Sequence, residues 1–393
     1  MERKVYLDSA ATTYVNSEVL QEMMPMFNSN FGNPSSLHFV GREANAKVDE
    51  ARIKIAKSIN AKPSEIYFTS SGTEANNWAI KGLAYANRTE TKNHIITSKI
   101  EHHSVLEACR ELEKEGFKVT YLDVDEYGVV KLSDLIHYLT DNTILVSIMA
   151  ANNEVGTIQY LKAIAETCKK KENVIFHADC VQAFSHININ VEDICLDAIT
   201  ISAHKIYGPK GAGCLYVKKG ININNLIVGG NQERAKRAGT LNVPAIVGFG
   251  KAVEIADRDM HAVNTKLKNL RDYLQKEITS KIAGVKFNGH MFQRLPHILN
   301  VSFECVDGES LLTMLDLEGI CVSTGSACTS GSVEPSYVLK AMGVKPEIAK
   351  GTVRFSISKS TTKEDIDYTV NKLVKIVERL REISPLQLKG GIK

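Results

Sequence analysis

The chain of 393 residues lacks the features that mark membrane, secreted and nucleic-acid-binding proteins. Its longest apolar stretch, residues 144–151, is far shorter than the ~20 residues of a membrane-spanning helix. Its amino terminus contains no apolar signal segment. The formal charge of +3 is too small for a polyanion binder unless the charge is clustered on one face. We therefore expect a cytoplasmic protein with no membrane partner and no nucleic-acid partner.

The eight cysteines are scattered, and no two of them are spaced as C-x-x-C. This spacing gives no support to a zinc ribbon, a thioredoxin-type motif or a clustered iron–sulfur ligand set, so no metal site is expected. A disulfide framework is typical of short secreted chains rather than of one this long. The ordinary role of any one of these cysteines is that of a small buried hydrophobic residue.

The first half of the sequence alternates short apolar runs with helical or loop segments. With 44% hydrophobic and 24% charged residues, the chain has the composition of a globular protein, and its length allows two or three domains. Alternation of this kind predicts an α/β fold with a mostly parallel sheet covered by helices. The runs are residues 66–69, 94–97, 119–122, 144–149, 174–178 and 198–202.

The second half changes character after a long helical pattern that runs from Val243 to about Ile282. Strand-like and helical segments then alternate as in a compact α+β domain. We predict a large α/β domain over residues 16–255 and a smaller α+β domain over residues 1–15 and 256–393. The smaller domain includes a loop at about 321–333, whose small polar residues predict mobility.

Polar residues follow the predicted strands where each of them ends. In open α/β sheets, ligands bind beyond the carboxyl ends of the strands, so these residues are expected at one edge. They are Thr73, His102, Asn153, Asp179, Gln182, His204 and Lys205.

Thr73 is placed to bind an anion, and Asp179 is placed to bind a cation. Ser71-Gly72-Thr73 opens a predicted helix, where free N–H groups bind phosphate, although alone it indicates only that Thr73 caps the helix. Asp179 ends a buried strand and needs a partner, for which a protonated pyridine nitrogen would serve. A helix cap is the alternative for Asp179.

Lys205 and His102 are two further candidate site residues beside Thr73 and Asp179. A desolvated lysine forms Schiff bases, whereas most lysines are solvated surface charges. A histidine stacks on an aromatic ring and moves protons, whereas an isolated one more often packs or caps a helix. Together, the lysine, the acidic partner and the phosphate cradle match the requirements of pyridoxal 5'-phosphate.

The sequence also resembles the cysteine desulfurases of the aminotransferase class V group, within the fold type I pyridoxal phosphate enzymes. The resemblance covers nearly the whole chain and rests on a highly specific set of motifs. These are residues 6–13 (YLDSAATT), 31–36 (FGNPSS), 71–77 (SGTEANN), 151–154 (ANNE), 179–182 (DCVQ), 202–205 (SAHK) and 324–328 (TGSAC).

The resemblance implies a role for each matching residue. Lys205 would form the Schiff base, Asp179 would pair with the pyridine nitrogen, Gln182 would lie near the ring hydroxyl, and His102 would stack on the ring and transfer protons. Arg354 and Asn33 would bind the substrate carboxylate. Asn153 would contact the cofactor, and the phosphate would be held by Thr73, Ser202, His204 and, from the partner subunit of a homodimer, Thr240.

The resemblance makes Cys328 the nucleophile. Its thiolate would attack the sulfur of cofactor-bound L-cysteine, leaving L-alanine and a persulfide on Cys328. The length of the surrounding loop resembles the NifS/IscS-type branch, which implies sulfur transfer to an iron–sulfur scaffold or another acceptor protein. A selenocysteine lyase, a class V aminotransferase and a non-catalytic sulfur scaffold are the alternatives.

Three positions depart from the family pattern. Cys180 replaces a common alanine, Cys321 is an extra thiol near the loop, and Asn231 interrupts a glycine-rich stretch. None of them removes a catalytic group.

Overall fold

The computed structural model describes residues 3–324 and 335–385, and its larger lobe is built on a seven-stranded sheet. Four neighbouring pairs in this sheet are parallel, and only β8 runs antiparallel to its two neighbours. In order across the sheet, the strands are β2 (Ile66–Thr69), β8 (Gly213–Val217), β7 (Ala198–Ser202), β6 (Ile175–Asp179), β5 (Thr143–Ser147), β3 (His94–Ser98) and β4 (Lys118–Leu122).

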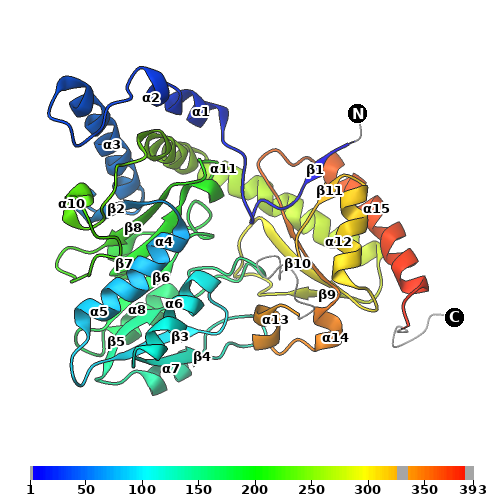
Figure 1. The fold of residues 1–393 in the computed structure, drawn as a ribbon. Coiled ribbons are helices and arrows are strands. Elements are labelled where there is room, and N and C mark those ends of the chain that lie inside the picture. Colours follow the sequence, from blue (N-terminus) through cyan, green and yellow to red (C-terminus); the bar gives the residue numbers. More distant parts are fainter. Residues whose placement is uncertain (1–2, 325–334, 386–393) are drawn as a thin grey trace.

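Helices cover both faces of this sheet (Figure 1). Because successive side chains of a strand point to opposite faces, Ile175 and Phe176 belong to different buried clusters. Phe176 packs in the cluster that contains α3 (Phe39–Ser58), whereas Ile175 packs in the cluster that contains α6 (His103–Lys114). The predicted α/β fold is confirmed, although the sequence patterns did not predict β8.

The smaller lobe combines an antiparallel sheet with two helices over one core. Its three strands lie in the order β12 (Thr352–Ser356), β10 (Ile298–Phe303) and β9 (Val285–Asn288). The helices α12 (Gly308–Leu317) and α15 (Lys363–Glu382) contribute to the same buried cluster. The amino-terminal β1 (Val5–Tyr6) pairs in parallel with β11 (Ile320–Cys321). Domain boundaries at residues 15/16 and 255/256 remain a proposal.

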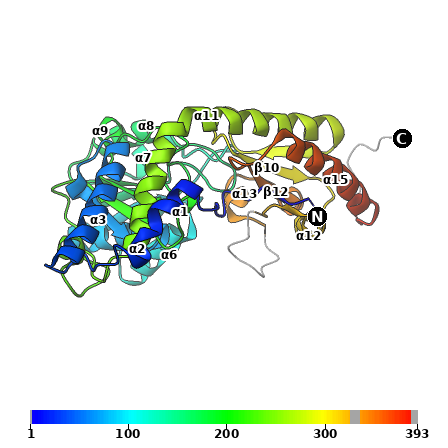
Figure 2. The same ribbon diagram turned by 90° about the horizontal axis from the view of Figure 1, so that it is seen from above.

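A single helix of 39 residues, α11 (Val243–Lys281), joins the two lobes (Figure 2). It begins with Asn242 as the capping residue and Pro244 in its first turn, as is typical of helix starts. Its first half packs on α3 and its second half contributes to the core of the smaller lobe. This helix therefore fixes the spacing of the two lobes.

Short helices occupy most of the remaining connections. No helix among the described residues is long and apolar enough to cross a membrane. These shorter helices are α1 (Ser17–Met23), α2 (Pro25–Asn28), α4 (Gly72–Asn77), α5 (Leu83–Asn87), α7 (Leu132–Tyr138), α8 (Leu161–Cys168), α9 (Val191–Ile194), α10 (Gln232–Ala235), α13 (Tyr337–Ala341) and α14 (Pro346–Ala349).

The close packing of α11 on α3 predicts an unusual response to alanine. A Cβ at Gly250 would lie 2.6 Å from the Ala51 Cβ and 2.7 Å from its Cα, and the α3 backbone cannot easily move away. Although alanine favours helices, we expect Gly250→Ala to lower the free energy of unfolding by about 1–3 kcal/mol in urea titrations. The matched control is Gly248→Ala, which meets the flexible Met23 thioether and should cost less. Equal effects of the two variants would contradict the packing argument.

Candidate active site

A cavity of about 410 Å³ lies at the carboxyl edge of the large sheet and includes residues of both lobes. The structure brings together most of the residues predicted from the sequence. Those that line the cavity are Thr73, His102, Asn153, Asp179, Gln182, Ser202, His204, Lys205 and Arg354. Asn33 and Thr240 are not among the lining residues, and Cys328 lies outside the described residues.

The turn between β2 and α4 forms one wall of the cavity. Ser71, and not Thr73, caps α4, because the Ser71 Oγ accepts the Glu74 N–H at 3.1 Å. A Cβ at Gly72 would lie 2.9 Å from the Val181 Cγ2, so glycine permits this close approach. Thr73 lines the cavity beside the first N–H groups of the helix, where an anion is favoured.

The Asp179 carboxylate, at the end of β6, is buried and accepts two hydrogen bonds. Its Oδ1 accepts the Val181 N–H at 2.9 Å, and its Oδ2 accepts from the Asn76 Nδ2 at 2.7 Å. Both of its oxygens therefore act as hydrogen-bond acceptors toward N–H groups, and the carboxylate would attract a cationic nitrogen. Asn76 was missed from the sequence, although it lies three residues after Thr73 and so on the same face of α4.

His102 both lines the cavity and caps α6, so the capping role and the site role coexist. Its Nδ1 accepts the Ser104 N–H at 3.1 Å and lies 2.8 Å from the Ser104 Oγ. Burial lowers the pKa of His102; the Asp179 charge opposes this shift and the Lys205 charge adds to it. The neutral imidazole is therefore favoured.

Lys205 lies in a short 3-10 turn that directly follows β7. Its Nζ donates to the carbonyl oxygens of Ala10, at 2.5 Å, and Ala11, at 2.8 Å. The Gln182 Nε2 donates to the same Ala10 oxygen at 2.7 Å. The amino-terminal stretch thus holds two site residues by its backbone.

Ser202 and His204 flank this turn. The Ser202 side chain is buried, with its Oγ 3.5 Å from the carbonyl oxygen of Ala212. The His204 Nδ1 lies 3.2 Å from the Thr12 Oγ1. Burial, with the nearby lysine charges, lowers the pKa of His204 to about 4, so its ring is neutral at physiological pH.

Arg354, on β12, brings the smaller lobe into the site. Its NH2 group forms an ion pair with the Asp8 Oδ1 at 2.7 Å, and its NH1 group donates to the Asn153 carbonyl oxygen at 2.9 Å. The Arg354 Nε and the Asn153 Oδ1 are buried and have no hydrogen-bond partner among the described residues. Buried polar atoms are rarely left unpaired, so these two atoms indicate a ligand. Asp8 was not predicted as a site residue, although it lies in the 6–13 motif.

Two predicted residues lie elsewhere. Asn33 is exposed, and its Oδ1 accepts the Ser35 N–H at 3.0 Å within a local turn. Thr240 is exposed as well. Within residues 3–324 and 335–385, no group of three or more His, Cys, Asp or Glu side chains could hold a metal ion.

A second buried carboxyl group, Glu101, lies directly before His102. Its Oε1 accepts from the Ser98 Oγ at 2.6 Å and from the Met149 N–H at 3.0 Å. Its Oε2 has no partner among the described residues. Burial raises the pKa of Glu101 to about 8, with a smaller contribution from the Asp179 charge, and the two hydrogen bonds oppose the shift.

A mostly parallel sheet with a lysine, an aspartate and a helix start at its carboxyl edge defines an aminotransferase-type enzyme. Residues 5–369 match the aminotransferase class-V family, and the chain belongs to this family. Cysteine desulfurase IscS of Clostridium botulinum is 53% identical over 388 residues, which cover 98% of this chain and 97% of that relative. Cysteine desulfurase IscS of Methanosarcina thermophila is 50% identical over 384 residues, which cover 98% and 94% of the two chains.

Solved structures agree with the sequence relatives. A NifS-like protein superposes with a TM-score of 0.91 and 42% identity, covering 96% of this chain and all of that chain. A NifS-like protein from Rickettsia africae gives a TM-score of 0.86 and 33% identity, with coverage of 96% and 100%. The predicted resemblance to cysteine desulfurases and the fold type I architecture are confirmed.

The raised pKa of Glu101 predicts how stability depends on pH. The folded protein keeps this carboxyl group protonated up to about pH 8, whereas the unfolded chain ionises it at its ordinary, lower pKa. The stability from this shift is therefore complete in acid and is lost as the pH rises through about 8. Urea unfolding between pH 5 and about 9 should show a smaller loss of stability for Glu101→Gln than for the natural protein.

The control is Glu107→Gln, on the exposed surface of α6. This variant should follow the pH dependence of the natural protein. Parallel curves for Glu101→Gln and the natural protein would show that Glu101 does not titrate in this range.

Proposed function

We propose that the protein is a pyridoxal phosphate-dependent cysteine desulfurase, which converts L-cysteine to L-alanine and transfers the sulfur to an acceptor. The observation that carries this proposal is a sequence identity of 50–53% to cysteine desulfurases over 98% of the chain. The convergence of Lys205, Asp179 and His102 on one cavity supports it.

The residues that line the cavity fit the cofactor. Asp179, oriented by two N–H donors, would pair with a pyridinium nitrogen, and Lys205 would form the Schiff base. Thr73, Ser202 and His204 would hold the phosphate near the start of α4. The unpaired Asn153 Oδ1 offers a further acceptor, and Gln182 would lie near the ring hydroxyl.

When bound, pyridoxal phosphate acts as an electron sink for reactions at the α-carbon of an amino acid. His102 lines the cavity with a ring kept neutral by burial, and the resemblance assigns it to proton transfer there. Lys205 is the second group that would move protons once the substrate has taken its place. Both side chains are held by hydrogen bonds within the cavity, which orients them before the substrate arrives.

Arg354 would bind the substrate carboxylate. Its guanidinium is buried and already oriented by Asp8 and Asn153, and its Nε keeps an N–H without a partner among the described residues. A charge-assisted bond to a carboxylate would satisfy that N–H. For Asn33, the proposal of substrate binding rests on the resemblance alone.

Cys328 would take the substrate sulfur as a persulfide, and an iron–sulfur scaffold protein is the proposed acceptor. The transfer balances because the sulfur leaves the substrate Cβ for Cys328 and a proton replaces it, which gives alanine. Reducing surroundings, such as those of the cytosol, keep a catalytic thiol from forming disulfides. The cysteines among the described residues are all free, which supports a cytoplasmic location.

One assay tests the activity. The holoenzyme with L-cysteine and a thiol reductant should release sulfide and alanine in equal amounts. Without the reductant, mass spectrometry should find one added sulfur atom on the Cys328 peptide. Cys328→Ser should lower the rate at least about 100-fold, as expected for the loss of a nucleophile, and keep the cofactor absorbance. The control is Cys321→Ser, an exposed thiol, which should retain the activity.

Two outcomes would contradict this function. A holoenzyme that releases neither alanine nor sulfide would overturn it. A Cys328→Ser variant that keeps most of its turnover would favour a selenocysteine lyase or a class V aminotransferase instead.

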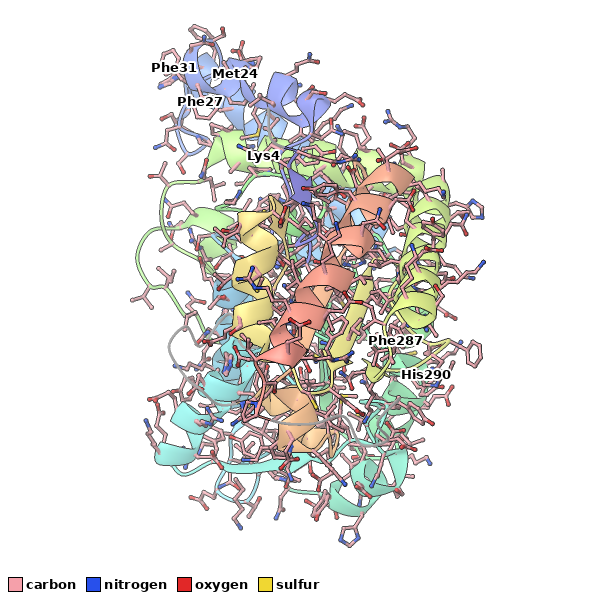
Figure 3. The ribbon with its side chains drawn as sticks, turned by 90° about the vertical axis from the view of Figure 1, so that its right-hand side faces the viewer. Lys4, Met24, Phe27, Phe31, Phe287 and His290 are labelled. Carbon is pink, nitrogen blue, oxygen red and sulfur yellow. The ribbon has the colours of Figure 1, made fainter. Side chains whose placement is uncertain are left out.

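We also propose that the protein is a homodimer. Large apolar side chains are exposed together around α1, α2 and the start of α3, and Figure 3 shows three of them, Met24, Phe27 and Phe31, at one end of the molecule. Clustered exposed apolar residues are typical of interfaces. Thr240 is exposed and does not line the cavity of its own chain, which supports its proposed role in the partner's site.

Charges in this cluster should separate the subunits. Phe27, 62% exposed, and Phe31, 68% exposed, would be buried in a dimer, so Phe27→Asp combined with Phe31→Asp should halve the mass found by light scattering. The control is Phe292→Asp, which is 86% exposed on the smaller lobe and should leave the mass unchanged. A monomeric natural protein would contradict the proposal.

A further inference from the structure

We propose that Ser104 is a positioning residue for His102, and that the series Asp179–Asn76–Ser104–His102 fixes both the orientation of the imidazole and the nitrogen that carries its proton. The inference rests on the proposed function, in which His102 transfers protons. Its geometry concerns the protein alone and can be tested without the cofactor.

The start of α6 decides which ring nitrogen is protonated. The Ser104 backbone N–H points at the His102 Nδ1 over 3.1 Å, and a backbone N–H can only donate. The His102 Nδ1 must therefore be an acceptor, so the neutral ring carries its proton on Nε2. The Ser104 Oγ lies 2.8 Å from the same Nδ1, close enough for its hydroxyl to donate a second hydrogen bond.

Asn76 sets the direction of the Ser104 hydroxyl. The Asn76 Nδ2 has two hydrogens, and it lies 2.7 Å from the Asp179 Oδ2 and 2.8 Å from the Ser104 Oγ. An ionised carboxylate only accepts, so the amide must present Nδ2, and not Oδ1, on this side. Because Ser104 accepts one of the amide hydrogens, its own hydrogen remains for His102.

Three of the four residues in the series are buried. Asn76 is 1% exposed, Ser104 is 6% exposed and Asp179 is 6% exposed, whereas His102 is half-buried where it lines the cavity. Each hydrogen bond in the series, from the Asp179 carboxylate to the His102 ring, has one donor and one acceptor. Hydrogen bonds in series within a low-dielectric interior strengthen one another.

The arrangement has a consequence for the site. With Nδ1 occupied at the start of α6, Nε2 is the nitrogen that remains for a ligand in the cavity. It meets that ligand as a hydrogen-bond donor, and the neutral ring takes up a proton only at Nδ1. The charged or titratable groups that act on His102 are Asp179, Lys205 and His103. Ser104 carries no charge, but its hydroxyl donates to Nδ1 and so favours the unprotonated ring.

The test is Ser104→Ala, with the His102 ring followed by 15N NMR in protein without cofactor. The natural protein should show the neutral Nε2–H form. The variant keeps the backbone N–H but loses the hydroxyl, so the His102 pKa should rise by about 0.5–1 unit. In the holoenzyme, the limb of the kcat profile that reports His102 should move upward by the same amount, kcat should fall about tenfold, and the KM for L-cysteine should stay constant.

Two variants separate positioning from general damage. Ser104→Thr keeps a hydroxyl and should restore the 15N shifts and the pH profile. Ser310→Ala is the matched control, because Ser310 donates from N and Oγ to its capping residue Asp307 at 2.8 and 2.7 Å, at the start of α12. It should change neither.

Specific results would overturn the proposal. They are an Nδ1–H form in the natural protein, or an unchanged His102 pKa in Ser104→Ala. If Ser104→Ala does not fold, Asn76→Leu breaks the same series, and an unchanged His102 pKa there overturns the proposal as well. If the NMR shifts move as expected while the natural holoenzyme forms no alanine, the positioning role stands and the proposed function fails.

Discussion

Burial of the Asp179 carboxylate is the constraint on which the site depends. A charge at the end of a buried strand is costly unless it is hydrogen-bonded, and the fold supplies two N–H donors, one from Val181 and one from Asn76. The second donor, Asn76, lies on α4. The hydrogen bond that the buried Asp179 carboxylate needs therefore helps to fix the position of α4 on the sheet. From there, Ser104 and His102 follow through hydrogen bonds.

The amino-terminal stretch extends this organisation to the smaller lobe. The backbone carbonyl of Ala10 accepts from Lys205 and Gln182 of the larger lobe, while Asp8 forms an ion pair with Arg354 of the smaller lobe. The Ser9 N–H also donates to the Ser356 carbonyl oxygen at 3.1 Å. Residues 8–10 therefore contact both Lys205, the proposed cofactor lysine, and Arg354, the proposed substrate arginine. This short stretch holds the two lobes in register at the site.

The sequence predicted the features that depend on local pattern. Apolar runs located β2 to β7, and the rule that ligands bind beyond the strand ends located Asp179 and Lys205. The strand β8 was missed, because it returns antiparallel from β7 and no α-helix separates the two strands in the sequence. The alternation of apolar runs with helical segments could not by itself locate β8.

Tertiary contacts explain what the sequence could not reveal in the site. Asn76 and Asp179 are separated by 103 residues, and Asp8 and Arg354 by 346. No local pattern distinguishes such an asparagine or aspartate from one on the surface. The helix position of Asn76, one turn after the start of α4, offered the only signal. Pairing at this distance is a property of the folded chain.

The environment of each thiol bears on the selectivity of the proposed sulfur transfer. Burial raises the pKa of Cys109 to about 12 and that of Cys180 well above its ordinary value, so both remain protonated thiols. Cys180, beside Asp179, is fully enclosed and also feels the neighbouring charge. Cys321 is exposed, but partial burial and the Asp316 and Asp8 charges raise its pKa too. Since thiolates and not thiols are nucleophiles, these extra cysteines are poor competitors for sulfur even where they lie close to the site.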